Sequence, residues 1–295
     1  MNPREEGFLL LSSHLGNPER KPLTVAQLRT LAQRIQGSAC SGEDRALRPE
    51  DLVALGYSRE MGARIVSLLE ETDLLRYYLK LGAKQNCIPI TRVSVNYPQA
   101  LRQKLGFDSP GCLWAKGDVS ILNTPSIALV GSRELRPENQ RFAVAVGHQA
   151  ARAGLTLISG NARGADRAAQ KACLEAGGRV ISIVADELIS QKTEDRILYL
   201  SEDGYDEPFS SQRALSRNRC IHALGTLTFV AQAELGKGGS WDGTMKNLRN
   251  NWSAVACFRD GSPASLELEQ MGAALICLED LADFGNIAAD NISFL

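Results

Sequence analysis

Residues Ser126-Ile-Ala-Leu-Val-Gly-Ser-Arg133 form a short apolar run that ends in glycine, serine and arginine. Residues 140–153 follow with the apolar spacing of a helix, and residues 155–159 (Leu-Thr-Leu-Ile-Ser) form a second apolar run. Near-continuous apolar strands that alternate with helices are typical of a parallel sheet covered by helices on both faces. This stretch therefore predicts an α/β fold of the Rossmann-like type.

The same alternation continues toward the C-terminus and predicts an extended Rossmann-like domain over residues 87–295. A proline- and glycine-rich connector at residues 88–125 precedes the first strand. The further elements that we expect are a helix at 165–176 and strands at 179–184, 224–231, 253–258 and 273–278.

Residues 1–86 have a different pattern, in which apolar residues recur every three or four positions, so we expect a small all-helical module there. Thr24, with Gln27 three residues later, is placed to cap a first helix. Pro49 is placed to open a second helix, because the first turn does not need its missing N–H. Residues 59–81 predict one long helix.

The segment at residues 52–65 resembles a helix-hairpin-helix module, and the whole N-terminal module would be of the SAM-like or helix-hairpin-helix-like kind. Such modules bind phosphate through backbone amides at a helix N-terminus. Only one glycine of the usual pair is present, Gly56. Contact with DNA and plain helical packing both remain open for this segment.

Composition and charge restrict the class of protein. The 295 residues include 33 basic and 34 acidic side chains, so a uniformly basic nucleic-acid coat is excluded but a local basic groove is not. Apolar residues make up 44% of the chain, which excludes disorder as its main state.

Seven cysteines occur without a C-x-x-C pair, so we expect reduced thiols and no metal site. The charged N-terminus makes a poor signal peptide, and no stretch reaches the roughly 20 apolar residues of a membrane helix, so we expect a cytoplasmic protein with no membrane partner.

Glycine and serine recur at the predicted carboxyl ends of three strands, each time with arginine or lysine nearby. Ligands of open parallel sheets bind at this edge. Glycine lets an anion approach the backbone, free amides surround it, and arginine binds phosphate oxygens in pairs. We therefore predict a phosphate-binding pocket, although a tight strand-to-helix turn needs glycine in any case. The candidate residues are Gly131, Ser132, Arg133, Ser159, Gly160, Arg163, Gly164, Asp166, Lys237, Gly239, Ser240 and Thr244.

Two further interpretations concern charged residues beside this pocket. Asp166, at the start of a helix, is placed to cap that helix or to hold Arg163. Arg217, Asn218 and Arg219 come just before an apolar strand, and either extend the basic surface or belong to a solvated helix face.

Several chemistries leave no signature in this sequence. No G-x-x-x-x-G-K-[ST] loop is present, and no G-x-G-x-x-G follows the first strand. The three histidines are scattered, and no H-E-x-x-H or G-x-S-x-G motif occurs. We therefore assign no catalytic residue and no cofactor, while a Ser-His-Asp triad assembled from distant positions stays open.

Taken in order, the motifs resemble those of the DNA-processing protein A family (DprA, also called Smf). The resemblance lies in residues 96–101 (N-Y-P-Q-A-L), 113–118 (L-W-A-K-G-D), 128–133 (A-L-V-G-S-R), 159–166 (S-G-N-A-R-G-A-D), 217–219 (R-N-R) and 237–244, which match the family's segments in the same order. Each segment is unspecific alone, but their number and order are specific.

The resemblance implies a helical module joined to an extended Rossmann-like domain. It further implies a non-catalytic protein that binds single-stranded DNA, acts as a homodimer and helps to load a RecA-like recombinase during DNA uptake and natural transformation. The pocket residues given above would then hold DNA phosphate, and Lys237, Arg217 and Arg219 would extend the basic surface.

The chain departs from the family pattern at four places around the expected pocket. Gln170 stands where the family has histidine, residues 231–233 read Ala-Gln-Ala instead of Val-Glu-Ala, the segment that ends at Thr244 is one residue longer, and residues 259–261 replace a Pro-Gly pair. We also expect no winged-helix module after about residue 290. These departures keep a second hypothesis open, in which the same pocket holds a free nucleotide, as in a nucleotide sensor or a nucleotide phosphoribohydrolase of the LOG type.

Overall fold

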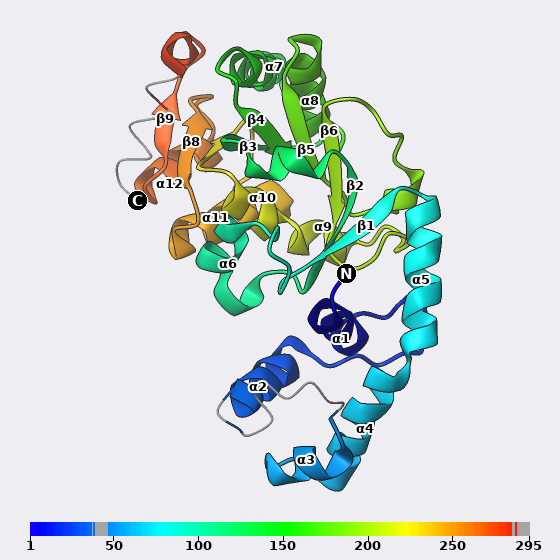
Figure 1. Cartoon of the computed structure of the whole chain (residues 1–295). Coiled ribbons are helices and arrows are strands. Elements are labelled where there is room, and N and C mark those ends of the chain that lie inside the picture. The colour runs from blue at the N-terminus through cyan, green and yellow to red at the C-terminus, as the bar shows by residue number, and fades with distance from the viewer. Residues whose placement is uncertain (37, 39–46, 285–286, 288–295) are drawn as a thin grey trace.

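The computed structural model describes residues 1–36, 38, 47–284 and 287. Its centre is a nine-stranded sheet in the order β1-β2-β6-β5-β4-β3-β7-β8-β9 (Figure 1). The strands are β1 (Cys87–Thr91), β2 (Cys112–Gly117), β3 (Ser126–Val130), β4 (Thr156–Ser159), β5 (Arg179–Ile183), β6 (Ile197–Ser201), β7 (Leu227–Val230), β8 (Ala254–Phe258) and β9 (Ala274–Ile276).

The seven strands from β6 to β9 in this spatial order (β6-β5-β4-β3-β7-β8-β9) pair in parallel. At the other edge, β1 pairs antiparallel with β2, and β2 pairs antiparallel with β6. The helices are α1 (Pro3–Ser12), α2 (Val25–Gln36), α3 (Pro49–Ala54), α4 (Arg59–Glu70), α5 (Thr72–Lys84), α6 (Gln99–Leu105), α7 (Pro137–Arg152), α8 (Ala165–Glu175), α9 (Ser211–Ser216), α10 (Asn218–Leu224), α11 (Gly238–Asn250) and α12 (Pro263–Gln270). Short 3-10 turns are η1 (Gly106–Asp108), η2 (Val119–Asn123), η3 (Leu188–Ser190) and η4 (Glu279–Asp283). The α/β Rossmann-like fold predicted from the sequence is confirmed.

The residues of β3 show how the sheet is covered. Ile127 and Leu129 belong to a buried cluster with side chains of α7 and α8. Ala128 and Val130 belong to a second cluster with side chains of α6, α10 and α12. Because successive side chains of a strand point to opposite faces, helices cover both faces and leave the carboxyl strand ends open between them.

The N-terminal helices divide between two cores. Leu23, Leu31, Leu52 and Ile65 form a small cluster of their own, which we call the helical module core. Leu9 of α1 and Leu75 and Tyr78 of α5 instead belong to the large core under the sheet. The capping pair predicted for α2 is present, since Thr24 N donates to Gln27 Oε1 at 3.0 Å and Gln27 N to Thr24 Oγ1 at 3.3 Å.

Two expectations about the elements are wrong. The single helix expected at residues 59–81 is two helices, α4 and α5, because the backbone leaves the helical conformation at Glu71. The connector expected at 88–125 contains β1, β2 and α6, and β2 pairs with β6 to widen the sheet. Strands β1, β2 and β6 all lie outside the strands predicted from the sequence.

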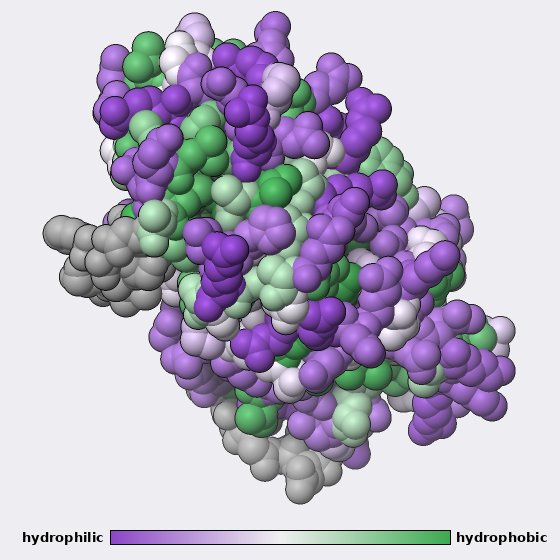
Figure 2. All heavy atoms as spheres, turned by 90° about the horizontal axis from the view of Figure 1, so that it is seen from above, coloured by the Kyte–Doolittle hydropathy of each residue, from purple (hydrophilic) through white to green (hydrophobic). Residues whose placement is uncertain are grey.

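The surface is largely polar on the face seen from above in Figure 2, where apolar side chains lie in smaller areas among hydrophilic ones. None of the described helices is long and apolar enough to cross a membrane.

Candidate functional site

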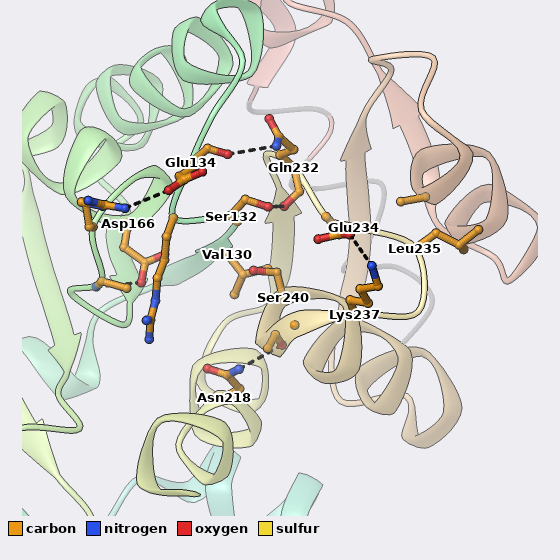
Figure 3. A pocket seen from close by; sticks show the side chains of 18 of the residues that line it. Val130, Ser132, Glu134, Asp166, Asn218, Gln232, Glu234, Leu235, Lys237 and Ser240 are labelled. Atoms are coloured by element: carbon orange, nitrogen blue, oxygen red, sulfur yellow. Dashed lines mark hydrogen bonds and ion pairs between the residues drawn. The ribbon is translucent and has the colours of Figure 1, made fainter. Parts of the chain in front are cut away.

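A cavity of about 1280 Å³ lies at the carboxyl ends of β3, β4 and β7. Figure 3 shows side chains from the loops after these strands and from α10 and α11 around it. We call it the strand-end cavity. The sequence-predicted residues that line it are Gly131, Ser132, Arg133, Arg163, Asp166, Arg217, Asn218, Lys237, Gly239 and Ser240.

Five predicted residues do not line the strand-end cavity. Gly160 lines a smaller adjoining cavity of about 380 Å³, which also touches Arg133. Arg219 lines a groove of about 510 Å³ on the other side of Asn218. Ser159, Gly164 and Thr244 line none of these three cavities, and Thr244 is fully buried with its hydroxyl donated to Ser240 O at 2.7 Å.

Arg133 is the cation best placed to meet an anion. Its side chain is exposed, and it borders both the strand-end cavity and the smaller cavity beside it. Within the described residues, its guanidinium makes no hydrogen bond or ion pair. A charged group that the fold has not already satisfied keeps its full capacity for a ligand.

Two further exposed cations of the cavity have carboxylate neighbours. Arg163 pairs with Glu134 at 3.1 Å, and Lys237 pairs with Glu234 at 3.1 Å. All four side chains are exposed, so water and salt screen both pairs and a phosphate competes with the carboxylates at little cost.

Contrary to the expectation from the sequence, Arg217 does not extend a basic surface. The side chain is buried, and its Nη1 donates to the carbonyl oxygens of Gly160 and Ile183. Burial lowers the pKa of Arg217, and the charge of Asp166 opposes that effect. Arg217 therefore positions the loop after β4 from beneath the cavity.

Arg219 is also engaged by the fold. Its guanidinium pairs with Glu202 at 2.9 Å and donates from Nε to Asp108 O at 2.9 Å. Arg213, on the preceding helix, donates to carbonyl oxygens of Ala185, Glu207 and Pro208. Neither arginine reaches the strand-end cavity, so the cluster of arginines in the sequence is mainly structural.

Asp166 acts on the loop and not on Arg163. Its Oδ2 accepts from Gly160 N at 3.0 Å and from Ala162 N at 3.1 Å. Burial raises the pKa of this carboxyl, while Arg217 and the two amides oppose the rise. These two amides are therefore occupied, and the anion nest expected after β4 is partly closed.

Close backbone contacts explain the glycine at 164. Gly164 has φ of +90°, and an added Cβ would overlap the carbonyl oxygens of Ser132 and Arg133. At Gly164 the loops after β3 and β4 thus approach each other closely through their backbones. This glycine is needed to bring the strand ends together, whatever ligand they bind.

The N-terminus of α11 provides donors on the opposite wall of the cavity. Its N-cap is Lys237, whose side chain does not cap the helix, and Gly238, Gly239 and Ser240 form the first turn. Asn218 Nδ2 donates to Gly239 O at 3.0 Å and holds this turn against α10. The first amides of a helix carry partial positive charge, so they favour an anion in the cavity.

Gln232 and Arg136 are site residues that the sequence reasoning missed. Gln232 O accepts from Ser132 N at 3.0 Å, and Gln232 Oε1 accepts from Arg136 N at 3.0 Å. Gln232 therefore joins the loops after β3 and β7. Its position directly after an apolar strand, level with Ser132, was the signal that could have identified it.

The other departures also have structural places. Gln170 Nε2 donates to Ser159 Oγ at 2.6 Å and to Ser182 Oγ at 3.3 Å, and so links β4 to β5 under the cavity. Asp260 accepts from Asn139 Nδ2 at 2.7 Å and pairs with Arg136. Among the described residues, no three His, Cys, Asp or Glu side chains are grouped to hold a metal ion.

Comparison with known proteins gives a family for residues 89–282, which match the model described as DNA recombination-mediator protein A. The chain is 30% identical over 183 residues to DNA processing protein DprA of Streptococcus pneumoniae, a region that covers 58% of this chain and 64% of that protein. It is 30% identical over 142 residues to protein Smf of Escherichia coli K12, covering 44% and 38% of the two chains. The match thus spans less than two thirds of the length of either relative.

Solved structures give the same fold. DNA processing protein A of S. pneumoniae superposes with a TM-score of 0.66 at 24% identity, covering 88% of this chain and 98% of that chain. The Helicobacter pylori protein, described for its single-stranded DNA binding mode, gives 0.58 at 23% identity, covering 69% and 96%.

Proposed function

The chain belongs to the DNA recombination-mediator protein A family, and from that premise we propose that it binds single-stranded DNA in the strand-end cavity without catalysing a reaction on it. The observation that carries the proposal is the exposed Arg133, which forms no ion pair among the described residues and borders two cavities. The H. pylori relative, described for single-stranded DNA binding, supports this ligand over a duplex.

The chemistry of the cavity suits a phosphodiester. Arg133, Arg163 and Lys237 supply charge, and the first turn of α11 supplies amide donors. Each phosphate that these groups neutralise releases counterions, so affinity would fall steeply with salt. The backbone carries no base identity, so binding would be largely independent of sequence.

We further propose the wider role that this ligand implies for a member of the family. The protein would act in the cytoplasm as a homodimer, protect incoming single strands and help to load a RecA-like recombinase during DNA uptake. Light scattering on the purified protein tests the dimer. A recombinase filament assay, on strands coated with a single-strand binding protein, tests the loading.

The experiment that tests DNA binding is fluorescence anisotropy with labelled single- and double-stranded oligonucleotides over a salt series. We expect tight binding to single strands, with a log–log slope of about −0.7 for each neutralised phosphate. Equal or weaker binding of single strands relative to duplex, or no binding at low salt, would contradict the proposal.

A second candidate function is binding of a free nucleotide in the same cavity. The observation that favours it is the pairing of Arg163 and Lys237 with Glu134 and Glu234, which leaves little net positive charge for a long polyanion. Unlabelled nucleoside monophosphates added to the anisotropy assay, with detection of released base, distinguish the two. Tight nucleotide binding without DNA binding supports a sensor, and released base supports a phosphoribohydrolase.

A further inference from the structure

Three arginines gather where the helical module meets the sheet domain. The guanidinium of Arg29, on α2, lies 4.2 Å from the ring centroid of Phe107, and that of Arg92 lies 5.2 Å from it. Arg102, on α6, donates to Arg92 O at 3.2 Å and to Ser94 O at 2.5 Å. We call Arg29, Arg92, Arg102 and Phe107 the Arg29 cluster.

The Arg29 cluster has an excess of positive charge. In the part of the chain that the structure describes, none of its three arginines forms an ion pair with a carboxylate. The pKa of Arg92 is lowered by burial and by the charges of Arg102 and Arg29, while Tyr97 and Asp108 oppose the shift. Glu5, on α1, interacts with Ser94, whose carbonyl oxygen accepts from Arg102. Like charges held this close are relieved by a bound anion.

Phe107 leaves this cluster open to solvent. Its side chain is 46% exposed although it is a large apolar residue, and Arg29 and Arg102 are exposed as well. The cluster is formed by α2, the turn after β1, α6 and η1, so both parts of the protein contribute to it.

A groove adjoins the strand-end cavity on the side of the Arg29 cluster. Leu215 and Asn218 line both the strand-end cavity and the groove of about 510 Å³ beside it. Arg219 lines the groove and donates to Asp108 O, next to Phe107. In Figure 1, α6 accordingly lies between α10 and α11 on one side and α2 on the other.

The groove has the side chains that a single strand needs. Lys246 provides a cation, whose pair with Asp242 at 2.8 Å is exposed and screened by solvent. Gln212 and Asn218 provide amides, and Trp252 provides an aromatic side chain. Aromatic surfaces bind bases of any identity, and cations follow the backbone between them.

We propose that a DNA strand held in the strand-end cavity continues through this groove and that its phosphates reach the Arg29 cluster. The inference rests on the proposed function, because it extends the same ligand. It gives the helical module a direct part in DNA binding through Arg29 on α2.

Anisotropy on a length series of single strands, from about 4 to about 16 nucleotides, tests this path. Wild-type affinity should rise with length as the strand reaches the cluster. Arg29→Ala should lower affinity for the longest strand by about 3- to 10-fold and reduce the magnitude of its salt slope by about 0.7, without affecting the shortest strand. Arg29→Lys should restore the slope because it keeps the charge.

Arg34→Ala is the matched control, since Arg34 lies on the same helix and is exposed. Its guanidinium lies 4.3 Å from the ring centroid of Tyr57, so it belongs to a different contact from the Arg29 cluster. Lys246→Ala, in the groove, tests the path without touching the helical module, and should weaken binding of strands that extend beyond the cavity. Equal behaviour of wild type, Arg29→Ala and Lys246→Ala at every length overturns the path, while Arg133→Ala still reports on the cavity. Absence of binding by the wild type at every length overturns the proposed function together with the path.

Discussion

Arg133 and Arg163 each follow the carboxyl end of a strand, β3 and β4 respectively, but they have different neighbours in the structure. Arg133 forms no ion pair among the described residues, whereas Arg163 pairs with Glu134 at 3.1 Å. We expect Arg133→Ala to weaken single-stranded DNA binding by roughly 1–3 kcal/mol, the range for a lost charge-assisted contact. Arg163→Ala should cost less, about 0–1 kcal/mol, because its exposed pair already screens the charge. Anisotropy measures both, and equal affinity of the two variants and the wild type would remove the cavity as the DNA site.

Gly160 is a residue where one added methyl group should destabilise the fold. A Cβ at this position would overlap the guanidinium of Arg217, which is itself fixed by two carbonyl oxygens. We expect Gly160→Ala to lower the free energy of unfolding by about 1–3 kcal/mol, as overpacking does elsewhere. Urea denaturation followed by circular dichroism measures this loss.

Gly7→Ala is the control for that experiment. Gly7 lies within α1, and an added Cβ would meet only Leu69 Cδ2, at 3.8 Å. Alanine in a helix should be neutral or stabilise by about 0.5–1 kcal/mol. A Gly160→Ala protein as stable as the wild type would mean that Arg217 can move freely, and that it does not position the loop.

Among the elements, α1 and α4 are linked by one buried side chain, Arg20. Its guanidinium donates to Leu10 O and Ser13 O at the end of α1 and to Leu68 O of α4 at 3.4 Å, and it pairs with Glu71 at 2.5 Å. The arginine thus satisfies carbonyl groups at two helix ends that have no partner within their own helices.

Arg20→Met should lower the free energy of unfolding by about 2–4 kcal/mol. The value lies below the roughly 3–5 kcal/mol of a fully buried pair, because the Glu71 side chain is 35% exposed. Arg76→Ala is the control, since its pair with Asp73 is exposed on both sides and should be worth well under about 1 kcal/mol. Denaturation of both variants by urea decides, and equal losses would show that Arg20 is dispensable to α1 and α4.

The same joint explains why the element prediction for residues 59–81 was wrong. Leu68, Leu75 and Leu79 follow one helical period, so the apolar pattern alone cannot show a break. In the structure, Leu68 belongs to the helical module core and Leu75 to the core under the sheet. The chain changes direction at Glu71 because the two helices serve different cores.

For the whole molecule, the pH dependence of stability should contain a contribution from His222. This side chain is fully buried, its Nδ1 lies 3.2 Å from Thr228 Oγ1, and its Nε2 has no partner among the described residues. Burial lowers the pKa of His222 to about 3, from an ordinary value of 6.5. The unfolded chain therefore binds a proton below about pH 6.5 that the folded protein does not accept.

The contribution of neutral His222 to the free energy of unfolding is accordingly full above about pH 6.5, and it falls as the pH decreases toward 3. Between pH 7 and pH 5 this group should remove about 2 kcal/mol. His222→Asn should be less stable at pH 7 but should lose about 2 kcal/mol less than the wild type over the same interval. Urea denaturation at both pH values measures the difference, and His14→Asn, on the surface, is the control. Parallel pH profiles for His222→Asn and the wild type would show that the buried imidazole accepts its proton in the folded state.

Much of the sheet domain was predictable from local pattern. The apolar runs at β3, β4, β5 and β8 are continuous because parallel strands are buried on both faces, and glycine directly follows β3 and β4. The strands β1, β2 and β6 were missed. Cys87–Thr91 contains a proline, Cys112–Gly117 lies in the proline- and glycine-rich connector, and Ile197–Ser201 lies within a polar, irregular region. The pairing of β2 with β1 and with β6 is a long-range interaction, which no local pattern encodes.

The sequence by itself determined the alternation of strands and helices, and with it the gathering of glycine, serine and basic residues at one edge of the sheet. Local periodicity and the common direction of parallel strands are sufficient for that. Only the tertiary structure decided which charges remain for a ligand. Arg133 is exposed and forms no ion pair within the described chain, Arg217 is buried under the loop, and Arg219 pairs with Glu202. The physical reason is that burial and ion pairing depend on residues far apart in the sequence, such as Gly160 with Arg217, which meet only when the sheet is assembled.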